Sequence, residues 1–154
     1  MTTSNLDRDI AQSRADRHAS SDALTVLETA LTSAGPGREL DWLNSVAASL
    51  DAFIAAVDEQ SATSRSGDGL LSQITTREPR LAWRIDRLER EFDDIKASAR
   101  SLREQIQPEE GHPQVDVADI RNRVASLANR YRSQRAREAD LVYEAIDVDL
   151  GEGG

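Results

Sequence analysis

The sequence predicts an all-α protein, folded as an up-down-up-down bundle of four helices. Apolar residues recur at steps of three and four, which places them along one face of a helix. No stretch alternates polar and apolar residues with the period of two that marks a half-buried strand. Breaks near residues 34–37, 61–69 and 107–113 divide the chain into four segments, and helices joined by short loops pack antiparallel to their neighbours.

Length and composition favour a single domain with an aliphatic core. The chain has 154 residues, of which 38% are hydrophobic and only 4% aromatic, so Leu, Ile, Val and Ala must supply most of the interior. We expect one domain over residues 1–150, with a frayed start over 1–17 and a flexible tail over 151–154.

Charge and residue usage argue against several classes of function. Lys and Arg number 19 against 28 Asp and Glu, a net charge of −9, so we expect no basic surface that could follow a nucleic-acid backbone. Cys is absent, which excludes disulfides and thiolate-ligated metals. Neither an apolar run of bilayer length nor a signal peptide is apparent, so we expect a cytoplasmic protein without membrane contact.

The segment after Pro79 gives the clearest helix. Pro79 suits the first position of a helix, because its φ is already helical and its missing N–H would have no partner there. Residues 69–74 predict a short additional helical turn before it. The apolar stripe of this helix is Leu81, Ile85, Leu88, Phe92, Ile95, Ala99, Leu102 and Ile106.

The other three segments carry polar residues where an apolar stripe should continue. Gln134 and Glu138 interrupt the stripe of the fourth segment, and the second segment turns polar at Gln60. The first segment places Arg17 on the line that leads to its leucines. Because a buried carboxylate requires a partner, we expect Arg17 or Arg65 to neutralise Glu138 and the Gln134 amide to donate to it.

Residues on these stripes should be buried together at the centre of the bundle. Removing such side chains from water is the main favourable contribution to folding. The predicted core comprises Leu24, Leu27, Leu31, Leu43, Leu50, Ile54, Val57, Leu81, Ile85, Leu88, Phe92, Ile95, Leu102, Val124, Leu127, Tyr131 and Leu141.

The titratable residues form no familiar catalytic or metal-binding motif. Neither His18 nor His112 has a second histidine three or four residues away, as helical zinc motifs require. Lys96 is the only lysine and no nucleophile–base pair can be assembled, so we expect neither enzyme activity nor a cofactor. A dinuclear site would need inward carboxylates on several helices, and only Glu138 lies squarely on a stripe.

The C-terminal stretch 138–154 contains six acidic residues and no basic one. Acidic residues near the C-terminus of a helix oppose its macrodipole, so a solvated, frayed helix end is the simpler interpretation. A docking strip for a basic partner is the alternative.

Two stretches of the chain resemble bacterial hemerythrin-like (HHE cation-binding) domains. One is Gly69-Leu70-Leu71, followed by Glu78-Pro79-Arg80-Leu81, Ile85, Arg87-Leu88 and Glu91. The other runs from Arg135 to Ala145 and continues with Val148 to Gly151, similar to the last helix and tail of an actinobacterial branch. The resemblance covers about residues 18–151. It implies a four-helix bundle that holds a di-iron centre for oxygen, nitric oxide or iron handling.

The resemblance also places the metal ligands of the family, and most of these positions carry a different residue. Only the first-helix histidine is retained, as His18, while carboxylates stand at Glu138 and Asp140. Phe, Lys and Arg at ligand positions would fill a metal site with hydrocarbon or positive charge. The remaining ligand-equivalent positions are Gln60, Arg65, Phe92, Lys96 and Gln134.

Two functions follow from this resemblance. The first is a hemerythrin-like bundle that has lost its di-iron site and acts as a metal-free binding or regulatory module for a protein partner or small ligand, as a monomer or homodimer. In that form Phe92 is expected to fill most of the former ligand cavity. The alternative is an iron- or other metal-binding protein that uses carboxylates with a histidine, namely Glu138, Asp140, Glu91 and Glu28 with His18.

Overall fold

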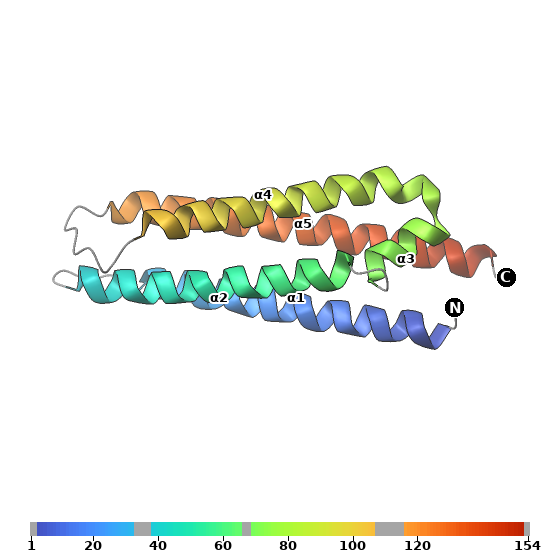
Figure 1. The fold of residues 1–154 in the computed structure, drawn as a ribbon, viewed down its shortest axis with the longest axis horizontal. Coiled ribbons are helices and arrows are strands. Elements are labelled where there is room, and N and C mark those ends of the chain that lie inside the picture. Colours follow the sequence, from blue (N-terminus) through green and yellow to red (C-terminus); the bar gives the residue numbers. More distant parts are fainter. Residues whose placement is uncertain (1–2, 33–37, 66–68, 107–115, 153–154) are drawn as a thin grey trace.

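The computed structural model describes residues 3–32, 38–65, 69–106 and 116–152, and no strand occurs within these ranges, in agreement with the all-α prediction. Four long helices lie side by side along the long axis of the molecule, and α1 begins at the end of the molecule where α5 finishes (Figure 1). The elements are α1 (Thr3–Thr32), α2 (Glu39–Arg65), α3 (Leu70–Arg77), the 3-10 turn η1 (Pro79–Leu81), α4 (Ala82–Gln105) and α5 (Val117–Glu152).

The long helices are paired into two hairpins. Along each of them the colours in Figure 1 progress in the direction opposite to that of the preceding long helix. The most extensive contacts join α1 to α2, and the next most extensive join α4 to α5. The two hairpins meet through α2 and α4 on one side and, more sparsely, through α1 and α5 on the other, while the short α3 contacts α1, α2 and α4.

A close approach of backbone explains how α3 follows α2. The turn predicted over residues 69–74 is a full helix, which continues to Arg77. Gly69 precedes it, and a Cβ at this position would lie 2.4 Å from the carbonyl oxygens of Thr63 and Ser64. Any residue other than glycine would therefore collide with the last turns of α2.

The ends of the other helices differ by a few residues from the sequence-based expectation. Pro79 opens η1 rather than α4, and Leu81 N–H donates to the Glu78 carbonyl at 2.9 Å before α4 begins. Helix α1 already begins at Thr3, within the stretch where we expected fraying, and α5 continues to Glu152, past the expected start of the tail.

Apolar side chains form two clusters. The larger one lies toward the connections from α1 to α2 and from α4 to α5, and the smaller one toward α3 and the end of α5. The larger cluster comprises Leu24, Leu27, Trp42, Leu43, Val46, Ala47, Leu50, Phe53, Val57, Phe92, Ile95, Ala99, Leu102, Ile106, Ile120, Val124, Leu127, Ala128 and Tyr131. The smaller cluster comprises Leu70, Leu71, Ile74, Leu81, Ile85, Leu88, Leu141, Val142 and Ala145.

Most of the predicted core is buried, with two corrections. Leu31 and Ile54 are only half-buried, at the margin of the larger cluster. Next to Ile54, Phe53 turns fully inward and meets Tyr131 edge to face, with ring centroids 5.5 Å apart. Trp42, which is absent from the predicted core, is buried as well, and its Nε1 donates to the Leu31 carbonyl at 3.3 Å.

Helix α2 corrects the expectation that no segment reaches bilayer length. Within Glu39–Ser64 a window of 18 residues has a mean hydropathy of 1.3, and by length and composition alone this helix could cross a membrane. The core helix of a soluble protein passes the same test, and α2 contributes seven residues to the larger cluster, including Leu50 and Val57. The location of the protein therefore stays a prediction.

Candidate functional site

A set of buried polar side chains borders the larger apolar cluster on three of the long helices. On α5, for example, it falls between Tyr131 of the larger cluster and Leu141 of the smaller one. Each member is at most 8% exposed, which is unusual for such residues. The set, called here the polar layer, comprises Ser13, Arg17 and Ser20 on α1, Gln60 and Ser61 on α2, and Gln134 and Glu138 on α5.

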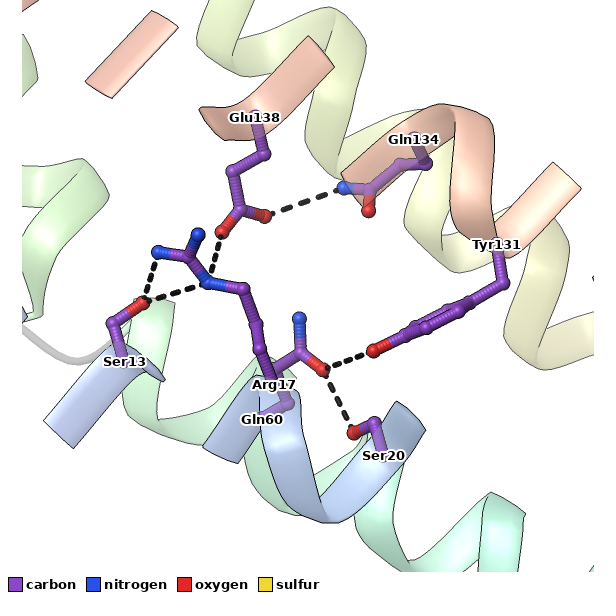
Figure 2. A network of polar contacts seen from close by, with 7 residues as sticks. All are labelled: Ser13, Arg17, Ser20, Gln60, Tyr131, Gln134 and Glu138. Atoms are coloured by element: carbon purple, nitrogen blue, oxygen red, sulfur yellow. Dashed lines mark hydrogen bonds and ion pairs between the residues drawn. The ribbon is translucent and has the colours of Figure 1, made fainter. Parts of the chain in front are cut away.

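An ion pair between α1 and α5 forms the first half of the polar layer. Arg17 Nε lies 3.1 Å from Glu138 Oε1, and the two side chains are 9% and 4% exposed. Arg17 Nη2 donates to Ser13 Oγ at 2.7 Å, one turn earlier on α1 (Figure 2). The second carboxylate oxygen, Glu138 Oε2, accepts from Gln134 Nε2 at 3.4 Å. The expected pairing of Glu138 with Arg17 and Gln134 is thus present.

Burial dominates the electrostatics of this pair. The loss of solvation raises the pKa of Glu138 above its ordinary value, while Arg17, the Gln134 hydrogen bond and Arg135 act in the opposite direction. The ion pair therefore offsets only part of the cost of burying the carboxylate. Removing one partner of such a pair leaves an uncompensated charge in the interior.

The second half of the polar layer centres on one amide oxygen. Gln60 Oε1 accepts from Ser20 Oγ at 2.8 Å and from Tyr131 OH at 3.3 Å, so it links α1, α2 and α5 (Figure 2). Tyr131 is itself fully buried, and its burial raises the pKa of the phenol. The phenol is therefore neutral at ordinary pH and able to donate to the amide.

A small cavity adjoins the polar layer between α2, α3, α4 and α5. It holds about 20 Å³ of space for the centre of a water molecule, which is room for a single molecule. Phe92 and Leu88 from α4 form part of its wall, and the space is partly open to solvent. The lining residues are Gln60, Ser61, Ser64, Leu71, Leu88, Glu89, Phe92, Gln134 and Glu138.

The structure brings four of the ligand-equivalent residues together, since Gln60, Phe92, Gln134 and Glu138 all line this cavity. The sequence pattern predicts this grouping of the four residues. It assigns no role to Ser20, whose spacing of three from Arg17 on the same face is the available signal.

The remaining ligand-equivalent residues lie elsewhere. His18 and Asp140 are exposed to solvent. Lys96 is directed to the boundary of α2 and α4, where its Nζ lies 3.4 Å from Asp58 Oδ1. The Arg65 side chain and His112 are outside the described residues.

Carboxylates do not converge on a metal-binding arrangement in the part of the chain that the structure describes. No group of three or more His, Asp or Glu side chains able to hold a metal ion occurs there. The Glu138 carboxylate is already paired with the Arg17 guanidinium. Glu91 and Glu28, two further candidates, pair with Arg137 and Arg132 respectively.

A larger groove lies on the surface between α4 and α5, with a volume of about 230 Å³. Trp83 stands at this groove and is 65% exposed, which is unusual for tryptophan. The three arginines that line it are paired with acids: Arg84 with Glu144 at 2.5 Å, and both Arg87 and Arg137 with Glu91. The groove is consequently close to electrically balanced.

Comparisons of the chain with protein-family models, with curated proteins and with solved structures find no match. The residues and their geometry therefore carry the functional interpretation.

Proposed function

We propose that this protein is a hemerythrin-like, up-down-up-down four-helix bundle whose di-iron site has been replaced by a buried polar network, and that it acts as a metal-free binding or regulatory module. The antiparallel order of the four long helices supports the bundle. The resemblance of residues 69–91 and 135–151 to HHE domains supports the family.

The Arg17–Glu138 ion pair is the observation that carries this proposal. Metal ions in helical bundles are held by inward carboxylates and histidines. Here the inward carboxylate is already neutralised by a guanidinium at 3.1 Å, and the neighbouring ligand-equivalent positions are two amides and a phenyl ring. A divalent cation would have to displace Arg17 and leave that positive charge unpaired in the interior.

The metal-binding alternative has less support. It requires carboxylates such as Glu138 and Asp140 to act with His18, yet Asp140 and His18 are exposed while Glu138 is 3% exposed. We likewise propose that the chain is not an enzyme, that it is cytoplasmic, and that it binds neither nucleic acid nor membrane. Its partner would be a protein or a small ligand, and it would act as a monomer or homodimer.

Metal titration tests the proposal directly. Purified protein should contain iron, manganese and zinc well below one equivalent by elemental analysis. Added Fe(II), Mn(II) or Zn(II) should leave the melting temperature unchanged, because only ligands that bind the native state preferentially raise it. A stoichiometric metal content, or a metal-dependent rise in melting temperature that is lost in Glu138→Gln, would overturn the metal-free proposal.

Restoring ligands provides the complementary test. A variant with Gln60→His, Phe92→His and Gln134→His, three residues that line the same cavity as Glu138, should gain metal binding only when Arg17→Met is added. Arg17 otherwise holds the Glu138 carboxylate. Tight metal binding by the variant that retains Arg17 would contradict the role given to the ion pair.

A further inference from the structure

One atom of the polar layer has no partner among the described residues. Gln134 is 2% exposed, and its Oε1 is fully enclosed without a hydrogen-bond donor. Its Nε2 donates to the Glu138 carboxylate, so the opposite amide orientation would turn Oε1 toward that negative charge. Oε1 is therefore held on the side away from Glu138, and a buried acceptor in this state costs free energy.

A second amide at the same cavity has the opposite requirement. Gln60 accepts both of its hydrogen bonds at Oε1, from Ser20 and Tyr131. Its Nε2 group points away from Ser20, toward the interior of the network (Figure 2). Gln60 and Gln134 line one cavity, so its occupant would meet an amide that needs a donor and an amide that needs an acceptor.

We infer that this cavity is a binding site for one water molecule, which accepts from Gln60 Nε2, donates to Gln134 Oε1 and so bridges α2 to α5. The cavity has about 20 Å³ for the centre of the molecule, where a water needs at least about 10–15 Å³. Ser61, which is 6% exposed and lines the cavity, offers a hydroxyl as a further partner. A small rotation of the Gln134 amide is inexpensive, because its terminal torsion is broad.

The demand for both a donor and an acceptor selects the kind of occupant. Ammonium can only donate, and chloride can only accept, so each would leave one amide unsatisfied. Sodium or potassium would be attracted to Gln134 Oε1 and repelled by the Gln60 N–H group. A neutral hydroxyl compound of this size is water.

The inference deepens the proposed function and rests on it in one respect. Gln60 and Gln134 occupy positions that the family resemblance assigns to metal-binding histidines, so the bridging water would stand in the place of the metal. The geometry of the two amides does not depend on that resemblance. A metal-binding result in the titration above would overturn the proposed function, whereas the outcomes below decide the water site alone.

A crystal structure of the full chain at about 1.5 Å resolution, with crystals grown in rubidium chloride, provides the test. We expect an ordered peak within hydrogen-bond distance of Gln60 Nε2 and Gln134 Oε1, without anomalous scattering from rubidium. In solution, the side-chain amide protons of both glutamines should show nuclear Overhauser effects to a long-lived water. In the variant Gln134→Met, we expect both the ordered peak beside Gln60 Nε2 and the nuclear Overhauser effect from the Gln60 amide protons to water to disappear.

The protein contains an internal control of matched size. A second hollow of about 20 Å³ lies between α3 and α5, lined mainly by apolar residues such as Ile74 and Val142. It should hold no ordered water, because a dry apolar cavity offers no hydrogen bonds. An anomalous rubidium peak at the glutamines, a direct Gln60–Gln134 hydrogen bond, or equal occupancy of both hollows would overturn the inference.

Discussion

The larger apolar cluster and the polar layer occupy neighbouring stretches of α1, α2 and α5, but different forces hold them. In the cluster, Leu27, Leu50 and Val57 are fully buried by contacts that have no required direction. In the polar layer, Arg17 and Glu138 depend on a few contacts of fixed geometry. Volume-conserving changes are tolerated in an apolar core, whereas a buried charge that loses its partner is not.

The difference indicates a division of roles within one helical fold. The cluster contains most of the buried apolar residues, and we expect it to supply most of the hydrophobic stabilisation. The polar layer links α1 to α5 and α1 to α2 through named donors and acceptors, and we expect it to fix the relative register of these helices. Substitutions in the two regions should therefore change the unfolding free energy by different amounts and for different reasons.

The largest expected effect comes from breaking the ion pair. Arg17→Met leaves Glu138 buried with only the Gln134 amide, and we expect a loss of about 3–5 kcal/mol in unfolding free energy. Urea unfolding followed by far-ultraviolet circular dichroism measures it. The double variant Arg17→Met with Glu138→Leu removes both charges and should be more stable than Arg17→Met alone. A double variant that is no more stable would show that packing, and not charge, dominates this position.

Truncations in the apolar clusters should cost slightly less. We expect Leu50→Ala and Leu88→Ala each to lose about 2–5 kcal/mol, because both leave a cavity in a packed interior. Leu88 borders the existing cavity, so its value should be the lower of the two. Equilibrium denaturation provides both numbers, and a loss under about 1 kcal/mol for Leu88→Ala would contradict its assignment to the core.

A smaller effect is expected from pH, because Arg17 and Gln134 offset part of the desolvation of Glu138. The folded pKa of Glu138 is raised above its ordinary value of 4.5, so between these two values the folded state binds more protons than the unfolded state. The contribution of Glu138 to stability is therefore fully present below pH 4.5 and is lost as the pH rises through the raised pKa.

Comparison with Glu138→Gln isolates this contribution from that of other acids. Glu144, for example, has its pKa lowered by Arg84 and contributes in the opposite direction. The difference in unfolding free energy between wild type and Glu138→Gln should shift in favour of wild type as the pH falls toward 4.5. A difference that is constant with pH would mean that Glu138 titrates normally.

The smallest effect is expected at an exposed ion pair that also joins an arginine to a carboxylate. Arg90 Nη2 lies 2.7 Å from Asp86 Oδ2, closer than Arg17 to Glu138, but the side chains are 78% and 57% exposed. We expect Arg90→Ala to cost about 0.3–0.5 kcal/mol, since water screens such a pair and competes for it. A cost comparable to that of Arg17→Met would remove the distinction between the polar layer and the surface.

By itself, the sequence determined the helical class, the apolar stripes and the polar interruptions at Gln60, Gln134 and Glu138. These features are local, because helical periodicity fixes which residues share a face whatever the helix packs against. For the same reason the pairing of Glu138 with Arg17 could be predicted, since both stand on inward stripes and a buried carboxylate needs a cation.

Only the tertiary structure decided which neighbouring residue turns inward and which partner each polar group finds. The choice of Phe53 over Ile54 depends on the space beside Tyr131, and one turn of a helix offers both candidates to the interior. The placement of η1 ahead of α4 depends in the same way on how the helices pack against one another. So does the half-burial of Leu31.

The cavity beside Gln134 is likewise a tertiary feature, because it is the space left where four elements fail to fill the volume between them. Periodicity could place Gln60 and Gln134 on inward faces, but not the orientation of their amides. That orientation follows from the donors and acceptors that packing brings within hydrogen-bond distance, namely Ser20, Tyr131 and Glu138. Chain positions far apart in sequence supply these partners, so no local pattern encodes them.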